Sequence, residues 1–86
     1  MKFFYVYVLR SKARNWWYVG VTADLRKRFH EHNNGKSPST KGFLPLDLIF
    51  YEAYRNLKDA KRREKYLKTS KGKTTLRLML REYLRA

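Results

Sequence analysis

Residues 3–9 read FFYVYVL and residues 16–21 read WWYVGV. β-Branched and aromatic side chains dominate both stretches, which predicts two β-strands. The polar residues 11–15 between them are typical of a turn, so we expect an antiparallel hairpin. Tyr5 and Tyr7 would share one face of the first strand, because side chains alternate along a strand. Their repeated hydroxyl groups indicate a partly wet surface, although aromatic packing with the hydroxyl reaching solvent explains them as well.

The segment after the hairpin contains a helix pattern, a loop and a third strand. Thr22 is expected to cap a helix over residues 23–32, and the Asn-Asn-Gly sequence at 33–35 is expected to end it. Residues 36–44 have the composition of a loop. Residues 46–54 largely alternate between the two faces of an extended chain, which predicts a strand.

The C-terminal part of the chain is expected to be helical. Asn56 provides a cap for a helix over residues 57–69, and Lys-Gly-Lys at 71–73 is expected to break it. A final helix would run from about residue 74 to the end of the chain. The order ββαβαα predicts an α+β fold, a small three-stranded antiparallel sheet flanked by three helices. With 86 residues in all, the chain is expected to form one domain over residues 1–86.

Charge is the clearest feature of the composition. Twenty-one Lys and Arg oppose seven Asp and Glu, giving a net charge of +14. Such an excess repels itself in a compact fold unless an anion offsets it, and it exceeds the roughly 8 charges that solubility requires. Nucleic acid is therefore favoured as a partner over other polyanions such as membrane surfaces. The sequence has no cysteine, no signal-peptide pattern and no apolar run of membrane-spanning length, so we expect a cytoplasmic protein without membrane contact.

Glu64 interrupts the apolar face of the second predicted helix. It falls on the same stripe as Ala60 and Leu67 at about 100° per residue. A carboxylate there is costly unless a cation or a donor meets it. One interpretation is an ion pair with Lys61 or Lys68. The other is a metal ligand, because one hard carboxylate with waters and phosphate oxygens is a normal environment for Mg²⁺.

Arg28 and His32 lie one turn apart on the first predicted helix and share a face. Leu25 and Phe29 lie beside them as packing residues, which places Arg28 at the border of core and surface. A guanidinium held there suits a phosphate, because its planar fork offers paired donors. For His32 taken alone, a solvated helix position is the favoured interpretation.

The predicted hairpin contains two tripeptides at a characteristic spacing. Tyr5-Val6-Tyr7, ten intervening residues and Tyr18-Val19-Gly20 resemble the paired signature of the GIY-YIG nuclease superfamily. The chain is similar to the small single-domain bacterial branch and to the nuclease domain of the bacterial excinuclease. Tyr5 and Val6 replace the first glycine and the isoleucine of the signature, and no asparagine follows Asn56, although many members carry one near the end of the domain. Further matches cover nearly the whole chain: residues 20–22, 24–25, 28, 31–33, 35, 45, 51–52 and 60–65.

The resemblance implies a role for each residue that stood out. Glu64 matches the glutamate that binds a divalent metal, Mg²⁺ or Mn²⁺, and Arg28 matches the arginine that steadies the scissile phosphate. His32 matches a histidine found near that phosphate in several branches. Gly20 matches the glycine that lets the backbone approach the site closely.

Tyr7 and Tyr18 match the two signature tyrosines, one of which deprotonates or positions the attacking water. A free tyrosine has a pKa near ~10, so a neighbouring cation would have to lower it. Lys12 and Lys41 are the candidate neighbours.

We therefore expect a metal-dependent endonuclease that hydrolyses nucleic acid, with DNA favoured over RNA, in the bacterial cytoplasm and on the nucleoid when bound. A single visible acid argues for one metal rather than two. The alternatives are a non-catalytic nucleic-acid-binding module on the same scaffold and a basic structural protein such as a ribosome-associated one. No protein partner is indicated. A basic set is expected to hold the nucleic acid, unless it is only a solvated face: Lys41, Lys61, Arg62, Arg63, Lys65, Lys68, Lys71 and Lys73.

Overall fold

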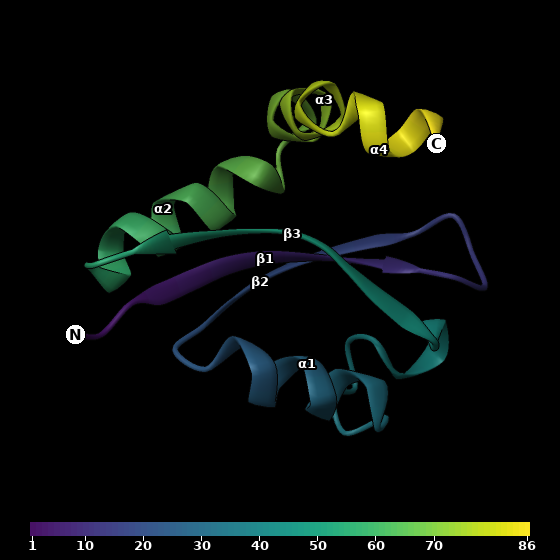
Figure 1. The fold of residues 1–86 in the computed structure, drawn as a ribbon, viewed down its shortest axis with the longest axis horizontal. Helices are drawn as coiled ribbons and strands as arrows, with labels where there is room; N and C mark the ends of the chain where they lie inside the picture. The colour runs from purple at the N-terminus through teal and green to yellow at the C-terminus, as the bar shows by residue number, and fades with distance from the viewer.

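The structure, a computed structural model, describes all residues from Met1 to Ala86. A three-stranded antiparallel sheet of order β2-β1-β3 separates two helical layers, with α1 on one face and the other helices on the opposite face (Figure 1). No helix combines the length and the apolar character needed to cross a membrane. The strands are β1 (Phe4–Ser11), β2 (Trp17–Thr22) and β3 (Leu46–Tyr54). The helices are α1 (Leu25–Asn33), α2 (Leu57–Leu67), α3 (Ser70–Met79) and α4 (Arg81–Arg85), with a 3₁₀ turn η1 (Lys41–Phe43).

The central strand β1 is buried on both faces, and this divides the core in two. Val6 and Val8 face α2 and α3, where they pack with Leu67. Tyr7 and Leu9 face α1 on the other side. The alternation expected from the sequence is therefore confirmed, and it carries alternate β1 side chains into separate layers. Burial from both sides holds β1 as the rigid centre of the domain.

The start of α1 differs from the sequence expectation. Asp24 caps the helix, and its carboxylate accepts a hydrogen bond from the Lys27 amide. Thr22, the expected cap, is still the last residue of β2 and pairs with Tyr5 of β1. Its hydroxyl oxygen accepts from the amide of Asp24, so it shapes the turn into the helix without capping it. Pairing with β1 extends β2 to Thr22, whereas the sequence predicted a strand that ends at Val21.

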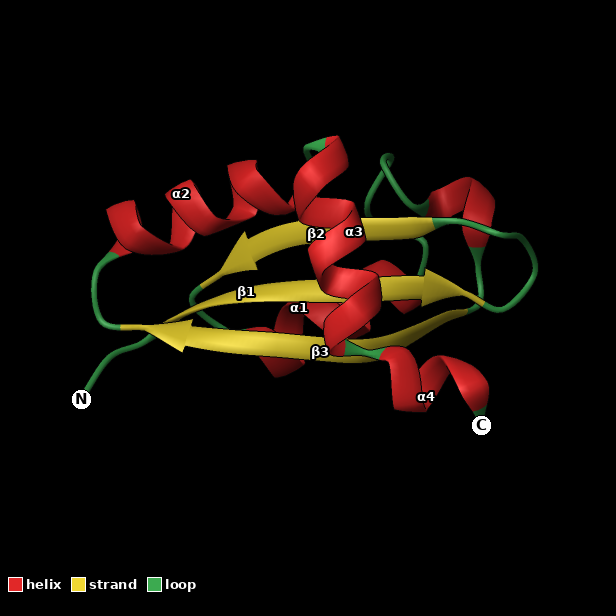
Figure 2. Cartoon of the chain, turned by 90° about the horizontal axis from the view of Figure 1, so that it is seen from above, coloured by secondary structure: helices red, strands yellow, loops and turns green.

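The C-terminal helices also differ from the expectation. Gly72 does not break a helix, because it lies inside α3, whose cap is Thr69. A Cβ atom at this position would collide with the backbone carbonyl of Tyr66 in α2, so the glycine allows the two helices to pack closely. A break at Leu80 separates α4 from α3, which gives four helices where three were expected. Figure 2 shows that α2 runs along the sheet whereas α3 crosses over its strands.

Candidate active site

Tyr7 forms the floor of the site. It lies on β1 opposite Gly20 of β2 and is only 2% exposed, so the expected wet surface is wrong at this residue. A Cβ atom at Gly20 would lie 2.5 Å from the Tyr7 hydroxyl oxygen. Only glycine therefore lets the phenol lie across the neighbouring strand. This gives a structural reason for the glycine in the second tripeptide.

His32 is fully buried between two hydroxyl groups. Its Nε2 atom lies 2.8 Å from the Tyr7 hydroxyl, and its Nδ1 atom lies 2.7 Å from Oγ1 of Thr40. Burial lowers the pKa of His32, the charge of Arg28 lowers it further, and Glu31 opposes the shift. The ring is therefore neutral near pH 7, with one nitrogen donating and the other accepting. A solvated position for His32 is thus wrong.

Thr40 was not identified from the sequence. It is completely buried although it lies in the polar segment between α1 and η1. No period or motif marks one threonine in such a segment, and only the return of the loop onto α1 brings it to His32. Ser37 in the same segment is also buried, which holds the loop against the domain.

The surroundings of Tyr7 keep its hydroxyl protonated. Burial raises the pKa of Tyr7 to about 12, and charges on Tyr18 and Glu64 act in the same direction, whereas Arg28 lowers it. Lys12 and Lys41 were the expected cations, but Arg28 is the one that acts on this phenol. Tyr7 is therefore a neutral hydrogen-bonding group near pH 7, not a phenolate.

Tyr18 extends the site toward solvent. It lies on the edge strand β2 and is partly exposed. Its ring centroid lies 5.2 Å from that of His32 and 6.3 Å from that of Tyr7. Trp16 flanks it on the outer side at 6.1 Å. The two signature tyrosines therefore meet around one histidine, with Tyr18 the one that solvent can reach.

Arg28 lies on α1 at the border of core and surface, as the sequence predicted. Its Nη1 atom lies 3.2 Å from Oε1 of Glu31, and both side chains are about one third exposed, at 34% and 33%. The guanidinium also acts on the Tyr7 hydroxyl, and a guanidinium has further N–H donors with which to bind an anion. Glu31 thus orients the arginine beside Tyr7 without enclosing it.

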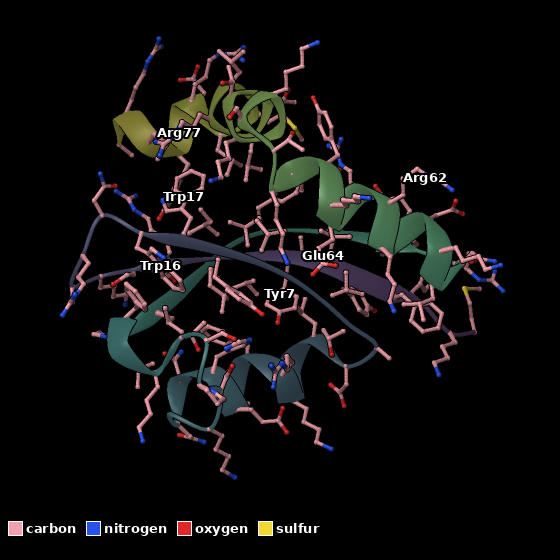
Figure 3. The ribbon with its side chains drawn as sticks, turned by 180° about the vertical axis from the view of Figure 1, so that it is seen from behind. Tyr7, Trp16, Trp17, Arg62, Glu64 and Arg77 are labelled. Atoms are coloured by element: carbon pink, nitrogen blue, oxygen red, sulfur yellow. The ribbon has the colours of Figure 1, made fainter.

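Glu64 points from α2 toward the same region. Its side chain is 25% exposed, and Oε2 lies 3.2 Å from Nζ of Lys68. Figure 3 shows Glu64 next to Tyr7, and its charge contributes to the raised pKa of that phenol. The pair with Lys68 that the sequence left open is present, while Oε1 has no hydrogen-bond partner in the chain.

The donor set suits a divalent ion held by one protein carboxylate. No group of three or more His, Cys, Asp or Glu side chains is close enough to form a metal cage. Water and substrate phosphate would have to supply the other ligands, which is the usual arrangement for Mg²⁺. Lys68 is half exposed, at 51%, and pairs of this kind are weak, so an ion can displace it. The residues present fit one ion and exclude a metal site built from protein ligands alone.

The sequence matches the model of a known family. The family model of the GIY-YIG catalytic domain matches residues 3–77. The chain belongs to the GIY-YIG family. Within this GIY-YIG domain, Tyr5 takes the place of the first signature glycine and packs edge-on against Tyr51, with ring centroids 6.0 Å apart. The family is one of nuclease domains, so the chain has a nuclease-type fold.

Individual relatives of this GIY-YIG domain carry the name UPF0213. The chain is 40% identical over 65 residues to the UPF0213 protein CPE1444 of Clostridium perfringens, covering 74% of this chain and 69% of the relative. It is 42% identical to YazA of Bacillus subtilis, covering 74% of this chain and 65% of that protein. The solution structure of the UPF0213 protein BH0048 of Bacillus halodurans superposes with a TM-score of 0.56 at 31% identity, covering 90% of this chain and 84% of that one. The chain thus spans about two thirds of the length of CPE1444 and YazA.

The basic set divides into paired and free side chains. Arg63 binds Glu52 through Nε at 2.9 Å and is partly buried, so it supports the fold and is not a free cation. Arg62 pairs with Asp59 at 3.0 Å, and Lys68 pairs with Glu64. The remaining members are exposed and make no ion pair, and nucleic-acid contact by them stays a prediction: Lys41, Lys61, Lys65, Lys71 and Lys73.

Proposed function

We propose that this GIY-YIG protein is a metal-dependent endonuclease that hydrolyses phosphodiester bonds, with DNA as its preferred substrate. One observation supports the proposal above all others. Arg28 from α1, Tyr18 from β2 and Glu64 from α2 all act on the phenol of Tyr7, although they come from distant parts of the sequence, and that phenol contacts buried His32. A fold held together by packing alone has no reason to gather these groups.

Arg28 would bind the scissile phosphate. Its free N–H groups can form paired, charge-assisted hydrogen bonds with two phosphate oxygens. Because charge grows on those oxygens as the bond breaks, a fixed guanidinium stabilises the transition state more than the ground state. The contact with Glu31 fixes its position in advance.

Tyr18 is the better candidate to contact the attacking water. Its ring is partly exposed, whereas Tyr7 is 2% exposed and its hydroxyl is bound to His32. Tyr7 would then act as a neutral partner that holds His32, and through it Thr40, in place. Positive charge on the neighbouring Arg28 would stabilise the hydroxide that remains when the water gives its proton to bulk solvent.

Glu64 would hold the divalent ion, Mg²⁺ or Mn²⁺. When bound, the ion supplies positive charge that polarises the phosphate and stabilises the leaving oxygen. Release of Lys68 from Glu64 would then leave an ammonium group beside the substrate backbone, where a cation is favourable.

The rival is a module that binds nucleic acid without cutting it. A carboxylate next to the phosphate weakens binding, so a binding module gains nothing from Glu64. The test is a cleavage panel of single-stranded, duplex and branched DNA, and the matching RNAs, with Mg²⁺ or Mn²⁺. The protein and its Glu64→Ala and Arg28→Ala variants are compared, with Glu82→Ala and Arg85→Ala as exposed controls.

Cleavage is expected only with a divalent ion. Glu64→Ala should keep or improve binding and abolish cleavage, while Arg28→Ala should slow cleavage by about 10²- to 10³-fold. The two control variants should cut like the parent, because their side chains are 79% and 74% exposed in α4. Equal cleavage by all five proteins would refute the proposal, and binding without cleavage on every substrate would establish the rival.

A further inference from the structure

A pocket of about 330 Å³ opens beside the candidate active site, between the end of the hairpin and the helices α2 and α3. Trp16, Trp17 and Tyr18 line it from the hairpin, with Trp17 on the α2/α3 face of the sheet and the other two on the α1 face. Lys68, Lys73 and Arg77 line it from the end of α2 and from α3. The pocket wraps around the open edge of β2, which is an outer strand of the sheet. Neither the family signature nor the proposed chemistry gives these two tryptophans a role.

Both tryptophan rings are held in place by a stacked neighbour. Trp16 stacks on Phe43 with ring centroids 3.7 Å apart and an interplanar angle of 9°. The Arg77 guanidinium lies over the Trp17 ring at 4.9 Å. Figure 3 shows Arg77 of α3 next to Trp17, with Trp16 below it and with Glu64 of α2 and Tyr7 of β1 nearer the middle of the view. Indole and guanidinium planes are the surfaces on which nucleobases stack.

The charges around the pocket all have one sign. Lys68, Lys73 and Arg77 line it, and no carboxylate does. A planar, uncharged group joined to phosphates complements an aromatic wall with a cationic rim. The volume lies near the lower limit for small-ligand sites, which suits a single ring system.

Two residues belong to both the pocket and the candidate active site. Tyr18 lines the pocket and lies against His32, and Lys68 lines the pocket and pairs with Glu64. A nucleotide adjacent to a phosphate held by Arg28 would therefore bring its base to this pocket.

We infer that the pocket binds one nucleobase that has left its stack, next to the phosphate to be cut. The inference rests on the proposed function for the position of the phosphate, and it adds the requirement that the substrate offers an unpaired base. Trp17 supplies the stacking surface, and Arg77 and Lys73 contact the neighbouring phosphates. A substrate with an unpaired nucleotide is then bound more tightly than a continuous duplex.

The larger hollow on the α1 side of the sheet does not compete for this role. It measures about 620 Å³ and is lined by Tyr5 and Tyr51, but Asp24 lies in its wall. It shares neither Tyr18 nor Lys68 with the candidate active site. A base bound there would leave its phosphate beside a carboxylate, which repels it.

The test compares two single strands of equal length and charge, an oligothymidylate and an oligomer of abasic deoxyribose phosphates. Dissociation constants are measured in EDTA, so that binding is read without cleavage. The parent is compared with Trp17→Leu and Arg77→Met. The matched controls are Tyr51→Leu, an aromatic residue 54% exposed outside the pocket, and Arg81→Met on α4. Far-ultraviolet circular dichroism checks that Trp17→Leu folds. If that variant does not fold, Arg77→Met decides the outcome, because the Arg77 side chain is exposed.

Loss of the bases should weaken binding to the parent by between about 5- and 150-fold. The ratio of the dissociation constants of the abasic oligomer and the oligothymidylate should shrink toward one in Trp17→Leu. It should fall in Arg77→Met and persist in both controls. A ratio near one in the parent, or one unchanged in both pocket variants, overturns the pocket and leaves the nuclease proposal standing. Base-dependent binding without cleavage on any substrate in Mg²⁺ refutes the nuclease and leaves the pocket. Failure of both oligomers to bind overturns the pocket and leaves the nuclease proposal to the cleavage panel, which also contains duplex and branched substrates.

Discussion

The hydroxyl oxygen of Tyr7 lies 2.8 Å from Nε2 of His32, and neither residue is more than 2% exposed. This contact joins the central strand to α1 and continues through His32 to Thr40. A buried polar chain of this kind is stable only when each member has a partner, and no buried side-chain polar atom of the protein lacks one. This series of hydrogen bonds from Tyr7 through His32 to Thr40 therefore fixes the positions of the groups around which Arg28 and Tyr18 lie.

Gly20→Ala should displace Tyr7 from His32. The added methyl group would lie 2.5 Å from the phenol oxygen, and burial leaves the ring little room to move. We expect the free energy of unfolding to fall by about 1–3 kcal/mol and cleavage to fall with it. Urea denaturation measures the first effect. Gly42→Ala is the matched control, because a Cβ atom there meets nothing within 4 Å, and an equal loss in both variants would contradict the assignment.

Acid should destabilise the protein through His32. Burial lowers the pKa of this histidine in the folded state, so below about pH 6.5 the unfolded chain takes up the proton first. Stability from the neutral ring is thus complete above that pH and is lost as the pH falls. The expected slope approaches about 1.4 kcal/mol per pH unit for one proton. Urea midpoints between about pH 7.5 and 5.5 should show the loss in the parent and in the exposed His30→Gln, but not in His32→Gln.

Lys68→Met should strengthen metal binding. Lys68 pairs with Glu64 at 3.2 Å, so it competes with an ion for the same carboxylate. Exposed pairs are worth up to about 1 kcal/mol, which predicts an affinity for Mn²⁺ up to about five-fold higher. Isothermal titration measures it, with Lys65→Met as a control for the loss of one charge on α2. An unchanged or weaker affinity for Mn²⁺ in Lys68→Met, relative to that control, would show that Lys68 does not compete with the ion for Glu64.

Arg62 and Arg63 should differ sharply although they are neighbours. Arg63→Met would leave Glu52, whose side chain is 24% exposed, without its cation, and we expect a loss of about 1–3 kcal/mol. Arg62 is 75% exposed and its pair with Asp59 lies in solvent, so Arg62→Met should cost less than about 0.5 kcal/mol. Thermal melts of the two variants make the comparison, and equal losses would contradict a structural role for Arg63.

The fold could be predicted from the sequence wherever local preference and packing agree. The hairpin is an example, since Val6 and Val8 favour a strand and also fill the core beneath α2 and α3. Gly72 shows the opposite case. Local preference treats it as a helix breaker, but its role is to let α3 approach Tyr66 of α2, a tertiary contact that no local pattern contains.

Candidate site residues could be identified from the sequence where one residue violates a pattern. Glu64 stood out because a carboxylate interrupts an apolar stripe, and Arg28 because it borders one. The burial of His32 could not be predicted, because it depends on Thr40 and on the return of the loop that carries it. The cation beside Tyr7 was likewise missed, since Arg28 reaches that phenol only after α1 packs on the sheet.

The central claim is that Glu64, Arg28 and Tyr18 surround one ion and one phosphate. Paramagnetic broadening by Mn²⁺ in the amide NMR spectrum locates the ion directly, with Glu64→Gln and Glu82→Gln as the two comparisons. The account predicts broadening centred on the amides of residues 64, 18 and 28, lost in Glu64→Gln and kept in Glu82→Gln. Broadening centred elsewhere, or unchanged by Glu64→Gln, would contradict it.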